Sequence, residues 1–236
     1  MVAAVSAPVF ERPENGAPLV TELVAGESLG VLEERDGWLR VVAPGHPTNL
    51  DPRGYPGWAR PGGLVEAPGW DPDLTVVAPN RASLPLGALL RRAGEGARLP
   101  DGGVVALEPG SVKPPGEPLE ASPLGISGGL LGLPYRWGGT DSTAGMDCSG
   151  LVFRVMGLLG VSVPRDADDQ FWRAPFRSRE GPERARREDL VFFGGESVTH
   201  VGFYLGDGTY LSEHGSSGTV VRGVDEDPYW GFARYI

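Results

Sequence analysis

The sequence contains only one cysteine, only three histidines and no long apolar run, and these features limit the possible structures and functions. A single cysteine excludes an intrachain disulfide, so disulfide bonding gives no information about the compartment. No apolar stretch is long enough to span a membrane, and the first residues lack the basic and apolar regions of a signal peptide. We therefore expect a cytoplasmic protein, or an extracytoplasmic one if its N-terminus was trimmed.

Basic residues are also few, because 21 lysines and arginines against 31 aspartates and glutamates give a net charge of −10. An acidic chain does not gain from the counterion release that drives nucleic-acid binding. It is also repelled by anionic polymers and membrane surfaces. The charge therefore favours a small soluble substrate and predicts no nucleic-acid or membrane partner; we expect a monomer.

Glycine and proline are abundant instead, with 37 and 23 residues. This composition is typical of a turn-rich, mostly β architecture. The first third of the chain alternates short β-branched and aliphatic segments with turns, and residues 66–122 continue in the same way. The segment KPPGEP at 113–118 resembles a linker between domains. We therefore predict two small β-barrel domains, at residues 1–66 and 67–122, the second of them degenerate.

The pattern changes after residue 122. Residues 148–159 place apolar side chains at helical spacing, and 166–172 predict a second, short helix. From Asp189 onward five strand-like segments follow, with Asp207-Gly208 as a hairpin turn signal between two of them. Helices followed by a meander of strands predict an α+β domain over residues 123–236.

Cys148 occupies an unusual position for a lone cysteine, which is more often a small buried apolar residue than a nucleophile. It opens the first predicted helix directly after Asp147, which stands at an N-cap position. The unpaired N–H groups and the macrodipole of a helix N-terminus favour a thiolate and can hold an oxyanion. A structural cysteine would sit more naturally inside the helix, so the position indicates a nucleophile.

A cysteine nucleophile needs a base, and histidine is the usual residue for that role. His46 lies in a turn of the first predicted domain, where we expect a solvated loop residue. His200 begins a strand in the same domain as Cys148, and Gly202 and Tyr204 share its face. Gly202 is expected to leave space there for the helix that carries Cys148. His200 is therefore the candidate base.

Four segments of the third domain, in order, resemble the signature of the NlpC/P60 family: PYRWGGTDSTAGMDCSGLV at 134–152, PRDADDQ at 164–170, EDLVFF at 188–193 and HVGFYLGDG at 200–208. Glu188 stands where that family has glycine. Near the N-terminus, VAGESLGVLEERDGWLRVVAP and the later GYPGWARPGGLVE resemble a bacterial SH3 (SH3b) module. The resemblance implies two SH3b-like domains followed by a papain-like α+β catalytic domain.

The resemblance also implies hydrolysis of amide bonds in peptidoglycan stem peptides, with Cys148 as nucleophile and His200 as general base. No metal or cofactor is expected, because Cys–His hydrolysis needs neither. The chain is similar to γ-D-glutamyl-L-diamino acid endopeptidases of the YkfC type, which implies a murein stem peptide with a free N-terminal L-Ala as substrate. The substrate contacts then implied are Tyr135, Asp147, Ser149, Asp166 and Tyr55. For Tyr55, as for Trp58, the alternative is a place in the core of the first barrel.

The third catalytic position of the family falls twelve residues after the base, at Ser212, whereas His214 lies two residues further on. Both side chains point to the same strand face, about 7 Å apart. Either the Ser212 hydroxyl orients His200, or a β-bulge brings the His214 imidazole into place. Ala167 also replaces a serine often found beside the acidic substrate contact.

The leading functional hypothesis is a dipeptidyl peptidase that cleaves between γ-D-Glu and the diamino acid during murein recycling. The alternative within enzymes is a cell-wall lysin that acts on intact peptidoglycan, with the SH3b modules as wall anchors. More distant alternatives are an inactive murein-binding protein and an acyltransferase-like use of the same dyad.

Overall fold

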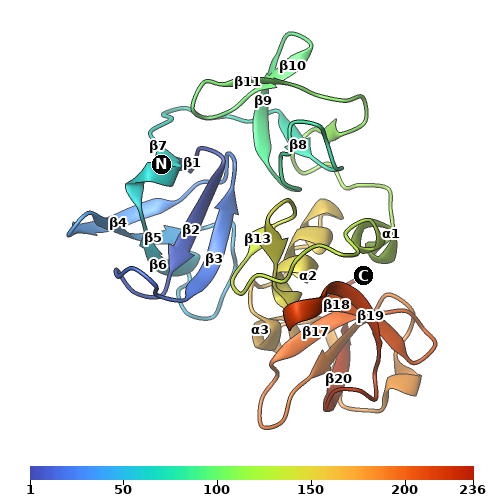
Figure 1. Ribbon diagram of the computed structural model, residues 1–236. Helices are drawn as coiled ribbons and strands as arrows, with labels where there is room; N and C mark the ends of the chain where they lie inside the picture. Colours follow the sequence, from blue (N-terminus) through green and yellow to red (C-terminus); the bar gives the residue numbers. More distant parts are fainter. The chain divides into compact units, whose positions relative to one another are not determined.

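The computed structural model describes residues 1–236, which divide into two compact units (Figure 1). The first unit comprises residues 1–119 and 137–143, and the second comprises 120–136 and 144–236. No helix combines the length and the apolar character that crossing a membrane requires.

The first unit begins with an antiparallel five-stranded sheet in the order β3-β2-β6-β5-β4. Its strands are β2 (Ser6–Phe10), β3 (Leu19–Val24), β4 (Gly30–Arg35), β5 (Trp38–Ala43) and β6 (Tyr55–Ala59). A separate short pair is formed by β1 (Val2–Ala3) and β7 (Leu64–Val65), and the 3-10 turn η1 (Pro61–Gly63) directly precedes β7. Asp36 and Gly37, both at positive φ, make the tight turn between β4 and β5. Apolar side chains such as Val9, Leu23 and Val41 form its core.

A second five-stranded sheet follows in the order β11-β10-β9-β8-β12. Its strands are β8 (Leu74–Val76), β9 (Leu89–Ala93), β10 (Gly96–Arg98), β11 (Val104–Ala106) and β12 (Val112–Lys113). The predicted linker at 113–118 therefore begins inside a strand, since Lys113 pairs with Thr75. The two predicted β-rich regions thus form sheets, but each sheet is open rather than closed into a barrel.

Part of the predicted catalytic motif belongs to the first unit. Thr140, in the short strand β13 (Thr140–Asp141), donates from its hydroxyl to the Glu22 carbonyl of β3 at 2.6 Å. Gly138, at φ +70°, packs so tightly that an added Cβ would lie 2.4 Å from the Leu19 carbonyl oxygen. The segment 137–143 is therefore fitted closely to β3.

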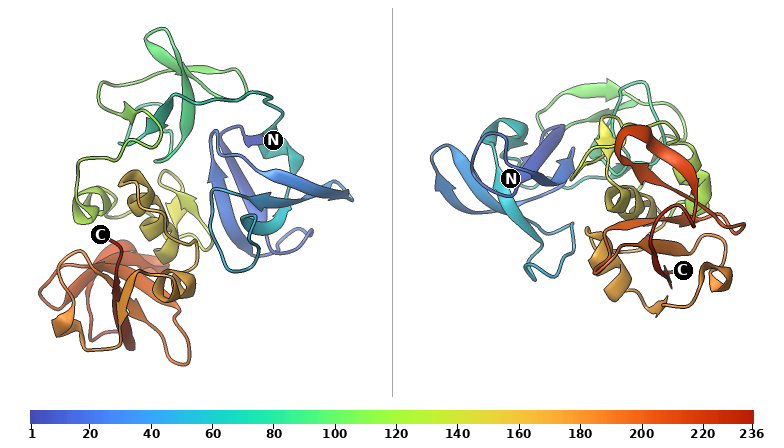
Figure 2. Two further views of the ribbon diagram at one scale, coloured as in Figure 1. Left: turned by 180° about the vertical axis from the view of Figure 1, so that it is seen from behind. Right: turned by 60° about the horizontal axis from the view of Figure 1, so that its bottom comes forward.

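The second unit combines three helices with a six-stranded sheet in the order β15-β20-β16-β17-β18-β19. The helices are α1 (Pro123–Gly128), α2 (Cys148–Leu158) and α3 (Ala167–Trp172), and the short strand β14 (Gly145–Met146) precedes α2. The sheet strands are β15 (Phe176–Ser178), β16 (Leu190–Phe193), β17 (His200–Tyr204), β18 (Thr209–His214), β19 (Gly218–Gly223) and β20 (Tyr229–Arg234), with 3-10 turns η2 (Pro182–Arg184) and η3 (Gly215–Ser217) between them. Helix α2 packs against β17 and β18 (Figure 2).

The predicted first helix is confirmed as α2. The Asp147 side chain caps it by accepting from the Gly150 N–H at 2.6 Å, and Gly160, at φ +75°, follows its C-terminal end. Leu151 and Val155 are fully buried on its apolar face. The second predicted helix is confirmed as α3, and the α+β character of this unit follows from its helices and its sheet.

The role predicted for Gly202 is wrong. A Cβ at this position would lie 2.6 Å from the Tyr210 ring and 2.9 Å from the Ser212 side chain. The space beside Gly202 is therefore filled by the neighbouring strand β18, not by the helix that carries Cys148.

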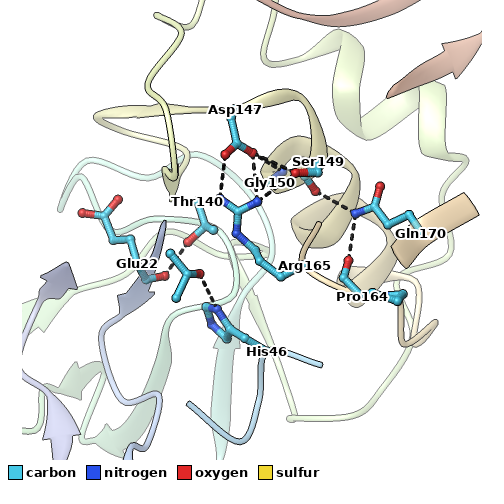
Figure 3. A network of polar contacts seen from close by, with 10 residues as sticks. Glu22, His46, Thr140, Asp147, Ser149, Gly150, Pro164, Arg165 and Gln170 are labelled. Atoms are coloured by element: carbon cyan, nitrogen blue, oxygen red, sulfur yellow. Dashed lines mark hydrogen bonds and ion pairs between the residues drawn. The ribbon is translucent and has the colours of Figure 1, made fainter. Parts of the chain in front are cut away.

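The prediction that His46 is a solvated loop residue is also wrong. Its side chain, labelled in Figure 3, is fully buried. Nδ1 lies 2.7 Å from the Thr21 hydroxyl, and Nε2 lies 3.2 Å from a Glu27 carboxylate oxygen. The turn that carries it closes through the His46 N–H bonded to the Ala43 carbonyl. This fold of the turn brings the imidazole against polar groups of the first sheet.

Candidate active site

Cys148 is the first residue of α2, and its side chain is almost fully buried. Burial raises the pKa of the thiol to about 12, and the neighbouring Asp147 carboxylate adds to the rise. The backbone N–H groups of Val201 and Ser149 act in the opposite direction, because they bond the sulfur and favour its anion. Since Val201 follows His200 directly, these bonds place the thiol beside the start of β17.

His200 faces His214, with 3.0 Å between the two Nε2 atoms and 4.2 Å between ring centroids. Burial lowers the pKa of His200 to about 4, and the His214 ring adds to the effect. The His200 imidazole is therefore neutral at physiological pH, which is the state that can accept a proton.

His214 is itself held on several sides. The Tyr210 hydroxyl lies 2.9 Å from Nε2 and donates to Asp227 at 2.7 Å, while Arg222 Nη1 lies 3.2 Å from Nδ1. These contacts from β18, β19 and the turn after β19 fix the imidazole next to His200.

The geometry separates the two candidates for the orienting residue. Tyr204 pairs with Tyr210 in the β17–β18 hairpin, and this register places His214 directly across from His200. The Ser212 hydroxyl is buried and donates to the Val201 carbonyl at 2.5 Å. The pairing of β18 with β19 runs without a break, so no bulge is needed to bring His214 into place.

Asp147 takes part in a buried network that Figure 3 shows from close by. Arg165, only 1% exposed, donates from both terminal nitrogens to the two carboxylate oxygens at 2.9 and 2.8 Å. The same Arg165 also donates to the Ser149 hydroxyl at 2.9 Å. The Asp147 charge is thus balanced by a guanidinium in the bidentate geometry that suits a carboxylate.

Sequence reasoning did not select Arg165, although it directly precedes Asp166 in the segment PRDADDQ at 164–170. The signal was an arginine next to a proposed acidic contact, in a chain with few basic residues. Its target could not be identified, because Asp147 is 18 positions away along the chain.

The segment around Asp166 is tied to the start of α2. The Gln170 side chain donates to the carbonyls of Ser149 and Pro164, at 3.0 and 2.8 Å (Figure 3). Asp166 occupies the N-cap position of α3, but its carboxylate makes no capping hydrogen bond. The Asp147 carboxylate therefore caps α2, whereas the Asp166 carboxylate does not cap α3.

Tyr135 lies near Cys148. Its backbone forms a parallel bridge with Met146, and the next N–H, of Arg136, bonds the Met146 carbonyl at 2.8 Å. Burial raises the pKa of the Tyr135 hydroxyl, and the charge of the Cys148 thiolate contributes next. In the first unit, Tyr55 is buried in the core of the first sheet, and Trp58 is half-buried on the same strand.

The chain is similar in sequence to known proteins. The model of the NlpC/P60 family matches residues 132–233, and a model described as the bacterial dipeptidyl-peptidase Sh3 domain matches residues 9–45. Among curated proteins, the chain is 32% identical to the γ-D-glutamyl-L-lysine dipeptidyl-peptidase of Bacillus subtilis over 220 residues, or 81% of this chain and 71% of that protein. The chain therefore belongs to the NlpC/P60 family of cysteine peptidases.

Two further matches differ in how much of the chain they cover. The peptidoglycan endopeptidase RipB of Mycobacterium tuberculosis is 39% identical over 106 residues, which cover 40% of this chain and 43% of that protein. The crystal structure of an NlpC/P60 family protein from Bacillus cereus has a TM-score of 0.85 at 21% identity, over 99% of this chain and 98% of that one. The first likeness is confined to less than half of the chain, whereas the second extends over the whole fold.

Proposed function

We propose that the chain is a cysteine dipeptidyl peptidase that hydrolyses the bond between γ-D-Glu and the diamino acid in murein stem peptides with a free N-terminal L-Ala. The observation that carries the proposal is a cysteine at a helix N-terminus beside a strand that begins with a paired histidine. A relative aligned over most of both chains is named for the same bond.

In this mechanism the Cys148 thiol attacks the amide carbon and His200 takes its proton. Burial favours the neutral forms of both groups, so the proton moves as the sulfur–carbon bond forms. We expect the N–H groups at the start of α2 and the Tyr135 hydroxyl to hold the oxyanion. His200 then protonates the leaving amine, and a water molecule that it activates hydrolyses the thioester.

His214 is proposed as the residue that orients His200. It lies within hydrogen-bond distance of the base, whereas the Ser212 hydroxyl is bonded to a backbone carbonyl. This assignment takes the second of the two possibilities left by the sequence, on the strength of the hairpin register.

Asp166 is proposed as the main carboxylate for the free amine of L-Ala. Asp147 is the weaker of the two carboxylates that the sequence suggested, because Arg165 already neutralises it and Gly150 bonds it. Ser149, bonded to both Arg165 and Asp147, is proposed as a further substrate contact. An ammonium ion gains from an acidic partner, whereas an acylated nitrogen does not.

The test compares wild type and Cys148→Ala on L-Ala-γ-D-Glu-L-Lys, its diaminopimelate counterpart, the N-acetylated peptides and purified sacculi. We expect release of L-Ala-D-Glu from the free tripeptides only, and no release by the variant. Lysis of sacculi would instead support the wall-lysin alternative. Absence of turnover with the fully reduced wild type would contradict a peptidase function.

A further inference from the structure

Glu213 is a buried ionisable side chain that the proposed reaction does not use. It lies in β18 between Ser212 and His214 and is fully buried. Because side chains alternate along a strand, Glu213 points to the face opposite to these two neighbours, where helix α2 packs against β18.

The hydrogen bonding of this carboxyl is incomplete. Glu213 pairs with Thr219 across β18 and β19, and the Thr219 hydroxyl donates to Oε1. The second oxygen, Oε2, is buried without a hydrogen-bond partner. A buried carboxylate with half of its acceptors unsatisfied is costly, whereas a protonated acid carries no charge to desolvate.

Glu213 is close to the residues that surround the nucleophile. The backbone of its partner Thr219 is bonded at 2.9 Å to both Gly132 and Leu133, in the segment that leads to Tyr135. Burial raises the pKa of the Tyr135 hydroxyl, and the charge of Glu213 makes a small further contribution. Burial, with the added charge of Asp147, raises the pKa of Glu213 to about 8.

The charges around Glu213 make its protonation state consequential. The ionisable groups of α2 and its N-cap are Asp147, which Arg165 neutralises, the Cys148 thiol and the buried Arg154. Helix α1, which also contacts β18, carries no ionisable side chain. A neutral Glu213 thus adds no charge near the site, whereas an ionised one adds an unbalanced negative charge.

Charged groups also lie on the opposite face of β18. The two rings of the catalytic pair, His200 and His214, face each other there, and Arg222 of β19 contacts the His214 ring. The alternation of side chains directs all three away from the Glu213 carboxyl. They therefore do not supply the missing partner of Oε2.

We propose that Glu213 is a positioning residue that acts as a neutral acid behind the nucleophile. When protonated, it bonds Thr219 and supports the segment of Tyr135 without opposing the negative charge that forms on sulfur and on the oxyanion. When ionised, it opposes both, so the site is turned off at alkaline pH. The proposal depends on the proposed function only for its turnover assay. The reactivity of the Cys148 thiol responds to the charge of Glu213 whether or not the protein is a peptidase.

The first experiment measures alkylation of Cys148 by iodoacetamide between pH 6 and 10, in wild type and Glu213→Gln. Because the chain has a single cysteine, the rate reports on the nucleophile alone. We expect equal rate constants at pH 6.5 and, at pH 9.5, a variant that reacts on the order of tenfold faster, since a nearby like charge disfavours the thiolate. Superimposable profiles would overturn the proposal.

The second experiment follows kcat/KM for the tripeptide over the same range. Wild type should lose about tenfold for one pH unit above the pKa of Glu213, and Glu213→Gln should not show this loss. Thr219→Val removes the hydrogen bond that favours the ionised form, so it should move the loss to higher pH. The same alkaline loss in all three proteins would contradict the proposal.

Thermal unfolding provides the control for folding. The pKa of Glu213 is raised in the folded protein, so the folded state binds a proton that the unfolded state releases, and stability falls as pH rises from about 4.5 to about 8. Glu213→Gln should therefore raise Tm at pH 8 and leave it unchanged at pH 4. No Tm shift at pH 8 would contradict a buried neutral acid, and an inactive wild type would contradict only the proposed function.

Discussion

A fully buried histidine in the first unit and a half-buried histidine in the second are both held by polar side chains, but their surroundings differ. His46 lies between the Thr21 hydroxyl and the Glu27 carboxylate, the combination of groups found in hydrolytic triads. His214 lies between Tyr210, Arg222 and a second imidazole, His200. The groups that surround a histidine therefore do not by themselves identify an active site.

What differs between the two sites is the side chain that could act as a nucleophile. The Thr21 hydroxyl is fully buried in β3, the edge strand of the first sheet, and it does not stand at the N-terminus of a helix. Cys148 begins α2, where the backbone N–H groups of Ser149 and of Val201, the residue after His200, bond the sulfur. Hydrogen bonding serves the fold at His46, and we propose that it serves a reaction at His200.

The largest expected effect separates these two histidines. His200→Ala should lower kcat/KM by a factor on the order of 10³ to 10⁴, because the thiol loses its base. His46→Ala should leave kcat nearly unchanged and lower the free energy of unfolding by about 1–3 kcal/mol, since buried polar partners lose a hydrogen bond. Steady-state kinetics and urea unfolding measure both. A large loss of kcat in a folded His46→Ala would remove the distinction.

A second comparison concerns the two side chains that share a face of β18. His214→Ala should lower kcat by about 10- to 100-fold with little change in KM, because His200 loses its orienting contact. Ser212→Ala should change kcat by less than about threefold and cost about 1 kcal/mol of stability, the value of one buried hydrogen bond. The opposite ranking of kcat losses would assign the orienting role to Ser212.

A third comparison sets a buried ion pair against an exposed one. Arg165→Met should lower the free energy of unfolding by about 3–5 kcal/mol, because it leaves the buried Asp147 carboxylate unpaired. Arg53→Met removes an equally bidentate but exposed pair with Asp51 and should have no measurable effect. Chemical denaturation of the three proteins measures the difference. Equal losses would indicate that the buried pair has no special weight.

The smallest expected effect is on the acid side of the pH profile. Because burial lowers the pKa of His200 to about 4, the neutral base persists well below pH 6.5, and kcat/KM should fall only as pH approaches 4. The unfolded state takes up a proton between pH 6.5 and 4 that the folded state does not, so stability should also decline across this window. An acid limb near pH 6.5 would show that His200 is not buried during turnover.

Much of the catalytic unit was predictable because its signals are local. Helix α2 and its Asp147 cap follow from residues within one turn of each other, and the hairpin turn follows from Asp207-Gly208. Closed barrels were not predictable in the same way. Strand composition indicates where strands form, but closure depends on whether the first and last strands pair.

The site residues divide along the same line. Cys148 and His200 could be selected because their residue types and the motif residues next to them are visible in the sequence. Arg165, Glu213 and the burial of His46 could not, because each depends on a partner from another element. The Gly202 prediction failed for the same reason, since the residue that fills its space comes from β18.

The sequence by itself determined the family and the order of the elements and selected the candidate nucleophile and base, because these depend on residue type and short-range spacing. Only the tertiary structure decided that His214 rather than Ser212 meets His200, that Arg165 neutralises Asp147, and that Glu213 is buried behind the site. The physical reason is that strand register and burial depend on side chains far apart in the chain.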